Sequence, residues 1–251
     1  MIWALFGAIA IGLSLGLLGS GGSILTLPIL VFLLDRPEKS AIAESLAIVG
    51  AIALAGSIPY AFRLQIHWRT VLFFGLSGVG GAYAGACLSA YISGSLQLSL
   101  FGVILLLAAF LMIKDFRSPD PWQIVRHPAW LLILEGFLLG NLTGCLGIGG
   151  GFLIVPILVL LVKLPMYSAI GTSLVIIALN AFTAFIKHFI ILASQGLAFD
   201  SSLVVLFISV GIIGSLAGSA ISKRISQKDL KKAFGWMLVP IGAYIFFASP
   251  A

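Results

Sequence analysis

The sequence has few charged residues and few side chains that could carry out chemistry. Of 251 residues, 9% are Asp, Glu, Lys or Arg, and there are three His and two Cys. Soluble globular proteins contain about 25% charged residues, so this composition excludes a chain whose whole surface faces water. Cys87 and Cys145 lie in separate apolar segments without ligand spacing, which excludes a disulfide framework and a zinc site. No pairing of nucleophile and base is recognisable, so we do not expect an enzyme.

Hydrophobic residues are abundant instead, at 61% of the chain. Apolar runs of about 20 residues, long enough to span a bilayer as a helix, recur along the whole sequence. The pattern predicts an all-α polytopic membrane protein. The net charge is +6, but the basic residues lie in short loops, where they orient the chain and attract anionic lipids. We therefore expect contact with membrane lipids and not with nucleic acid.

Comparison of the sequence with itself reveals a duplication. At an offset of 128 residues, GLLGSGGSILTLPIL from Gly16 aligns without a gap on GCLGIGGGFLIVPIL from Gly144, and 18 of the 33 positions from Gly16 to Ile48 are identical. A second stretch matches at an offset of 133, where three glycines of each half coincide: Gly78, Gly81, Gly85 on Gly211, Gly214, Gly218. Glycines and prolines in register indicate a true repeat. The predicted units are a first membrane repeat at 1–120 and a second at 121–251.

Each half begins with a long apolar run that a glycine cluster interrupts. Three ordinary spans follow in each half, expected at about 40–62, 70–93 and 96–113, and at about 168–192, 201–222 and 230–248. If each interrupted run forms a re-entrant hairpin, 11 basic residues fall on one side of the membrane and three on the other, a clear positive-inside pattern. We therefore predict, for each half, a hairpin plus three helices, with inverted repeats and both termini outside. If each interrupted run instead crossed the membrane twice, the number of crossings per half would still be odd, and the two repeats would still be inverted.

The glycine turns are the predicted substrate site. A short helix is expected to start after each turn, near Ser23 and near Phe152. Its N-terminus at the hairpin tip would offer unpaired N–H groups and the positive end of the helix dipole, which attract anions. Inverted symmetry would bring two such N-termini together around a small oxyanion. The predicted substrate-binding residues are Gly19, Ser20, Gly21, Gly22, Ser23, Ser45, Gly147, Gly149, Gly150, Gly151, Thr172 and Ser173.

Other roles for these residues stay open. Glycines at helical spacing also allow close helix packing, which is the favoured role for the six glycines matched at the offset of 133. Interhelical hydrogen bonds are an equally good explanation for the hydroxyls of Ser45, Thr172 and Ser173. Asn180, in the middle of a span, is expected to bond a neighbouring helix, with substrate contact as the alternative.

Three ionisable residues are candidates for proton coupling or for pairing with a charge. Glu44 lies about one turn inside a span, either as a proton carrier or as an interfacial partner of Arg36 or Lys39. Lys187 and His188 lie towards the end of an apolar stretch. Lys187 either neutralises an anion or extends to the interface.

The doubled motifs GSGGSILTLP and GIGGGFLIVP, followed by AESL and GTSL, resemble the TauE/SafE family of sulfite exporters and related anion permeases. The resemblance covers nearly the whole chain. It implies a multi-pass carrier for sulfite, sulfonates or similar sulfur-containing anions, with no bound cofactor. The first half departs from the family pattern, because Ser20 and Ser23 replace apolar and glycine residues, and Glu44 stands where threonine is common.

The favoured hypothesis is a secondary transporter for a small inorganic or organosulfur anion, working by alternating access. An anion channel and a non-transporting membrane assembly factor are the alternatives. The sequence leaves the direction of transport, coupling to protons and a homodimeric state open.

Overall fold

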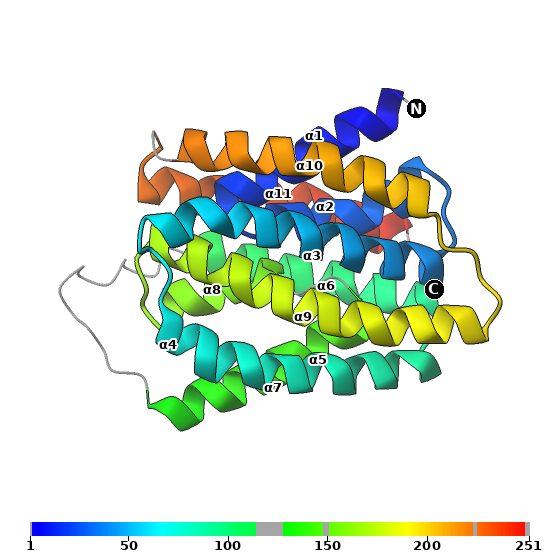
Figure 1. The fold of residues 1–251 in the computed structure, drawn as a ribbon, viewed down its shortest axis with the longest axis horizontal. Helices are drawn as coiled ribbons and strands as arrows, with labels where there is room; N and C mark the ends of the chain where they lie inside the picture. The colour runs from blue at the N-terminus through cyan, green and yellow to red at the C-terminus, as the bar shows by residue number, and fades with distance from the viewer. Residues whose placement is uncertain (1, 114–127, 148–150, 223–224, 249–251) are drawn as a thin grey trace.

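The computed structural model describes residues 2–113, 128–147, 151–222 and 225–248, and these residues form helices without a strand. Most helices lie side by side along the long dimension of the molecule (Figure 1). The elements are α1 (Ile2–Leu18), α2 (Gly21–Pro28), η1 (Ile29–Leu33), α3 (Glu38–Phe62), α4 (Trp68–Thr70), η2 (Val71–Gly75), α5 (Leu76–Leu88), η3 (Ser89–Tyr91), α6 (Gly94–Ile113), α7 (Ala129–Leu146), α8 (Gly151–Leu160), α9 (Met166–Ser194), α10 (Ser201–Ser222) and α11 (Gln227–Ala248).

The prediction of an all-α polytopic membrane protein is confirmed. Five of the described helical segments are long and apolar enough to cross a bilayer: Glu38–Phe62, Trp68–Tyr91, Ala129–Leu146, Met166–Ser194 and Ser201–Ser222. Helices α6 and α11 occupy the two remaining spans expected from the sequence. Large apolar side chains on the outer helix faces are exposed, which suits contact with lipid chains: Phe110 at 60%, Val205 at 64% and Ile213 at 71%.

The first interrupted run forms a helical hairpin. Helix α1 ends because Gly19 has a φ of +74°, a left-handed conformation that glycine adopts without steric cost. Helix α2 then turns back along α1. A Cβ at Gly22 would lie 2.7 Å from Cβ of Leu15, and a Cβ at Gly7 would lie 3.0 Å from Cγ2 of Ile29. The start of the second segment thus meets the end of α1, and its continuation at Ile29 meets the start of α1, so the two segments are antiparallel.

The second half ends its first helix in the same way. Gly147, the counterpart of Gly19 at the offset of 128, has a φ of +69° and its N–H donates to the Thr143 carbonyl at 2.9 Å. Helix α8 begins at Gly151. Positions 148–150 of the predicted turn lie outside the described residues, so the predicted contacts of Gly149 and Gly150 stay predictions.

Helices α3 and α9 lie at the centre and run in opposite directions (Figure 1). The loop residue His67, just after α3, donates its N–H to Thr172 near the start of α9. In the same way Asp200, just after α9, donates its N–H to Glu44 near the start of α3. The two helices correspond at the offset of 128, so this equivalent pair from the two halves is antiparallel.

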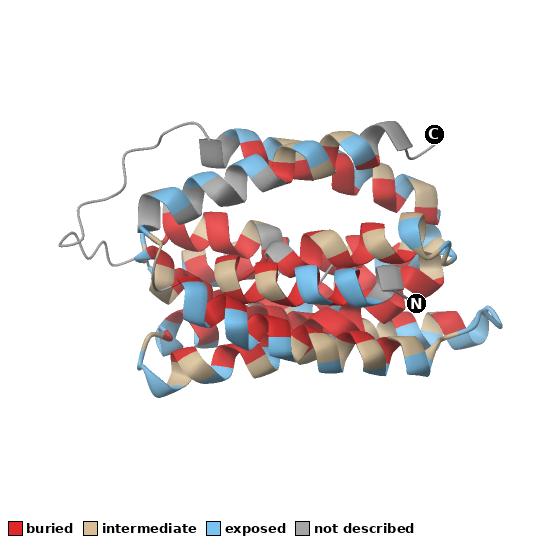
Figure 2. Ribbon diagram, turned by 90° about the horizontal axis from the view of Figure 1, so that it is seen from above, coloured by how far each residue is buried: buried red, intermediate tan, exposed pale blue. Residues whose placement is uncertain are grey.

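Glycines set the spacing of the outer helix pairs. Helix α1 packs on α10, and α7 packs on α5. A Cβ at Gly16 would overlap the Ser215 carbonyl, and one at its counterpart Gly144 would overlap the Ala82 carbonyl. A Cβ at Gly85 of α5 would likewise overlap the Asn141 carbonyl, and one at Gly218 of α10 the Leu13 carbonyl, which supports the packing role expected for the glycines of these two helices. Buried residues are concentrated in the middle of the bundle and exposed ones on its outer faces (Figure 2).

Candidate functional site

The two left-handed glycines are held by serines from the opposite half. Ser173 Oγ of α9 donates to the Gly19 carbonyl at 3.2 Å, and Ser45 Oγ of α3 donates to the Gly147 carbonyl at the same distance. Each hydroxyl is also 2.8–2.9 Å from a carbonyl of its own helix. Both serines are buried, and in this conformation their protons are directed at main-chain oxygens. The structure therefore favours bracing of the turns, one of the two roles that the sequence left open.

The first residues of α2 and α8 meet in the interior. A Cβ at Gly151, the first residue of α8, would lie 2.8 Å from Ser23 Oγ and 3.2 Å from Ser20 Cβ. The first turn of an α-helix has N–H groups without an intrahelical partner, and the helix dipole is positive at that end. Two such ends from the two halves therefore lie against each other within the protein.

Ser20 has an unused hydroxyl at this junction. It is the N-cap residue of α2, its side chain is fully buried, and Oγ has no hydrogen-bond partner among the described residues. Ser23 differs, because its Oγ donates to the Ser20 carbonyl at 2.7 Å. Buried hydroxyls are nearly always paired, so the unpaired Ser20 Oγ indicates a missing partner at the junction.

Of the predicted binding residues, the structure brings several to this junction and its two supporting turns. They are Gly19, Ser20, Ser23, Ser45, Gly147, Gly151 and Ser173, with Gly21 and Gly22 in the first turn of α2. Gly22 packs against α1. Thr172 is separate, because its hydroxyl accepts the His67 N–H at 2.9 Å where α9 meets the α3–α4 connection.

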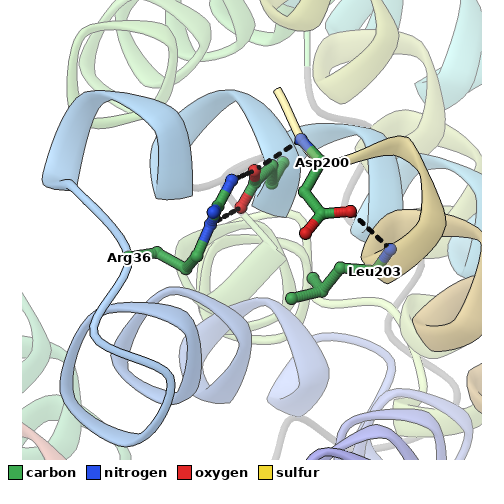
Figure 3. Close-up of polar contacts among 4 residues, drawn as sticks. Arg36, Asp200 and Leu203 are labelled. Atoms are coloured by element: carbon green, nitrogen blue, oxygen red, sulfur yellow. Dashed lines mark hydrogen bonds and ion pairs between the residues drawn. The ribbon is translucent and has the colours of Figure 1, made fainter. Parts of the chain in front are cut away.

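Glu44 forms an ion pair with Arg36 and accepts a hydrogen bond from the loop that carries Asp200 (Figure 3). Its side chain is fully buried and pairs with Arg36, whose Nε lies 3.2 Å from Oε2. The Asp200 N–H donates to Oε1 of Glu44 at 3.0 Å. The hydrogen bond to Glu44 raises the pKa of Arg36, and desolvation opposes that shift. The geometry favours the interfacial pairing with Arg36 over a proton carrier, and the carboxylate joins α3 to the loop that follows α9.

Lys187 and His188 occupy different environments at the far end of α9. The Lys187 ammonium lies 5.8 Å from the ring centroid of Tyr83, within cation–π range. His188 is buried, and its Nε2 lies 3.0 Å from the Gly144 carbonyl near the end of α7 and 3.5 Å from Ser89 Oγ. His188 thus bonds the helix that leads into the second glycine turn.

Sequence reasoning missed a polar cluster next to His188. The Lys39 ammonium donates to the Ser89 and Ile92 carbonyls at 2.8 and 2.7 Å and to Gln97 Oε1 at 3.0 Å. Gln97 Nε2 in turn donates to the Cys145 carbonyl. The polar residues at the end of one span and the start of the next were a signal, but only the fold shows that they converge on Lys39.

The described residues contain no group of three His, Cys, Asp or Glu side chains that could hold a metal ion. The arrangement instead offers main-chain N–H groups and a hydroxyl inside an apolar bundle. These groups are donors suited to an anion.

Comparison with known proteins agrees with this architecture. The sequence model of the family described as "Sulfite exporter TauE/SafE" matches residues 4–245. A "Probable membrane transporter protein" of Xylella fastidiosa (strain 9a5c) is 32% identical over 246 residues, covering 95% of this chain and 92% of that protein. The "Probable membrane transporter protein MJ0441" of Methanocaldococcus jannaschii is 29% identical, covering 94% of this chain and 93% of its own length.

No solved structure matches the chain significantly. The family match spans almost all of the sequence and agrees with the resemblance of the two glycine motifs. Its relatives carry the names of transporters and of no enzyme. The chain is a multi-pass membrane transporter that belongs to the sulfite exporter TauE/SafE family.

Proposed function

We propose that this protein is a secondary transporter for a small sulfur-containing oxyanion, such as sulfite or an organosulfonate, and that the anion binds between the N-termini of α2 and α8. The observation that carries the proposal is the contact of Gly151 with Ser20 and Ser23, which places two helix N-termini against each other in the interior. A small anion there would receive main-chain hydrogen bonds and the field of both dipoles without a buried cation.

The unpaired Ser20 hydroxyl supports the same position. An oxyanion oxygen would accept its proton, and Ser23 lies beside it in the first turn of α2. The preference for a sulfur oxyanion comes from the family description, and a tetrahedral or pyramidal oxyanion has enough acceptor oxygens to bond both helix ends. Transporters commonly bind anionic groups in this way, at the broken helices of two repeats.

The proposed transport cycle uses the two halves, residues 1–120 and 121–251, as inverted repeats. The opposite directions of α3 and α9, and the exchange of serine–glycine contacts between halves, support this interpretation. Equivalent movements of the two halves would then open the junction to opposite sides in turn. Because each glycine turn rests on the other half, movement of one half changes the support of both turns.

We propose that the protein lies in the cell inner membrane with both termini outside. The exposed Arg63 and Arg69 follow the end of α3, and Lys163 precedes the start of α9 at the same end of the bundle. Arg36 and Lys39 lie at the opposite end, near the start of α3. Basic residues are enriched on the cytoplasmic side of membrane proteins, so the end with Arg63 would face the cytoplasm.

The test is a flux assay with purified protein in vesicles, using labelled sulfite, sulfate, thiosulfate and a short sulfonate, with and without a pH gradient. We expect saturable flux of at least one sulfur anion. Countertransport against a trapped unlabelled anion distinguishes a carrier from a channel. Absence of flux for every anion, together with absence of anion-dependent thermal stabilisation, would contradict the proposal, since a ligand that binds the folded state stabilises it.

Gly21→Leu should abolish this flux, because Gly21 is the first residue of α2 and leucine would add bulk next to Ser20, where the anion is expected to bind. The measurement is initial flux in vesicles with the amount of inserted protein determined in parallel. Gly80→Leu is the matched control, since a side chain at Gly80 has open space around it and should leave flux unchanged. Equal flux in Gly21→Leu and wild type would remove the proposed site.

A further inference from the structure

Asn180 is a buried polar residue without a partner at the middle of α9. Its side chain is 1% exposed, and both Nδ2 and Oδ1 lack a hydrogen bond among the described residues. The amide lies over Gly78 of α5, where a Cβ would be 3.0 Å from both of its terminal atoms. The helix–helix hydrogen bond expected from the sequence is therefore not formed.

Packing does not require an asparagine here. The counterpart of Asn180 at the offset of 128 is Ile52 of α3, and Ile52 packs over Gly211 of α10, the counterpart of Gly78. The same contact is thus made once by an apolar side chain and once by a carboxamide. Because an unpaired carboxamide is costly in an apolar interior, its presence on one side only indicates a polar partner that binds there.

The position of Asn180 relates it to the proposed anion site. On the same face of α9, Ile177 lies one turn earlier and its Cδ1 would be 2.8 Å from a Cβ at Gly151, the first residue of α8. Two turns later on that face, His188 contacts the Gly144 carbonyl near the end of α7. Along α9, Asn180 therefore lies between Ile177, which meets the start of α8, and His188, which meets the end of α7.

On α9, the buried polar side chains nearest to Asn180 are Ser173 towards the start of the helix and His188 towards the Lys39 end. His188, Ser89 and Lys39 form the connected cluster at that end, and Lys39 is bonded to neutral oxygens there. The matching contacts in the other half are made by tyrosines. The Tyr60 hydroxyl donates to the Gly16 carbonyl, and the Tyr167 hydroxyl donates to the Ile225 carbonyl. The equivalent face of α3 carries Val49, Ile52 and Gly56 between Ser45 and Tyr60.

We propose that the Asn180 carboxamide binds the transported oxyanion on its way between the α2–α8 junction and the end of the protein that carries Lys39. This inference rests on the proposed function. The amide NH2 group supplies two donors to an anion without placing a charge in the middle of the membrane, where a buried ammonium would be far more costly. The His188–Lys39 cluster then places a cation beside the outer part of this route, where the other half has Tyr60 and Tyr167.

The test replaces Asn180 by the residue that the first half uses. Asn180→Ile is expected to keep or raise the thermal unfolding temperature without anion, because it removes an unpaired amide from an apolar contact. For the anion that wild type transports best, it should lower kcat/KM for flux by about tenfold or more, since a hydrogen bond to a charged ligand is lost. Asn180→Ala serves as a second variant if the isoleucine prevents folding.

Ser215→Ala is the matched control. Ser215 Oγ is also fully buried and has no partner among the described residues, but it belongs to α10, which packs on α1, and not to the face of α9 that meets α8 and α7. It should leave flux unchanged. An Asn180→Ile protein with wild-type kcat/KM would overturn the inference and leave water as the partner of the amide, while the transport function would stand. A wild-type protein without any anion flux would overturn both.

Discussion

Gly16→Ala should prevent the formation of stable, folded protein. A Cβ at Gly16 would overlap the carbonyl of Ser215 on α10, and the overlapping atoms are backbone, so no side-chain rotation can relieve the contact. Helices α1 and α10 would have to separate, and the loss of their packing should cost more than about 3 kcal/mol, as overpacking of a rigid interior does at its upper range. The measurement is the monodisperse fraction and the unfolding temperature of detergent-solubilised protein.

Gly80→Ala is the control for the effect of the extra methyl group itself. Gly80 also lies in a membrane helix, and a Cβ there has no neighbour within 4 Å. Alanine should stabilise that helix by about 0.5–1 kcal/mol or leave it unchanged. If Gly16→Ala unfolded at the same temperature as Gly80→Ala, the close approach of α1 and α10 would be contradicted. Gly144→Ala should repeat the Gly16 effect in the second half, where Ala82 takes the place of Ser215.

Arg36→Met should destabilise the protein by about 3–5 kcal/mol, the range found when one partner of a buried ion pair is removed. The Glu44 side chain is fully buried, so the loss of Arg36 leaves its charge without compensation, with the Asp200 N–H still bonded to it. Glu44→Gln should cost less, about 1–3 kcal/mol. Arg36 is 21% exposed and can turn to water, and the glutamine can still accept the Asp200 N–H.

Unfolding temperatures of the two variants, measured with Arg69→Met as an exposed control, test the order of these effects. A Glu44→Gln protein that is less stable than Arg36→Met would contradict the assignment. Flux in both variants should remain in the fraction that stays folded, because the Glu44 carboxylate is bonded to Arg36 and to the Asp200 N–H and is not among the groups proposed to bind the anion. Loss of flux in folded Glu44→Gln would restore a proton-carrying role for Glu44.

Much of the fold follows from local sequence patterns. Runs of apolar residues set the lengths of the membrane helices, since the bilayer thickness fixes how many residues a helix needs. Glycines at Gly19 and Gly147 end the first helix of each half, because both adopt a left-handed backbone. The offset of 128 residues also identifies α3 and α9 as equivalent helices.

The candidate site could be predicted only in outline. The glycine motifs indicated the helix starts of α2 and α8, and the resemblance indicated the family. The roles of the hydroxyls could not be chosen from the sequence, because Ser45 and Ser173 bond carbonyls about 100–150 residues away in the opposite half. Positions 148–150, which include Gly149 and Gly150, lie outside the described residues, so the second glycine turn stays a prediction there.

By itself, the sequence determined the class of protein, the helix lengths, the duplication and the glycines at which helices break, because these depend on hydrophobicity and on local backbone preference. Only the tertiary structure decided that Glu44 pairs with Arg36, that Ser20 lies beside Gly151, and that the Asn180 amide has no partner in the part of the chain that the structure describes. The physical reason is that a buried polar group is characterised by what it bonds. Its partners come from helices distant in the chain, and the packing of those helices decides which groups meet and which are left unpaired.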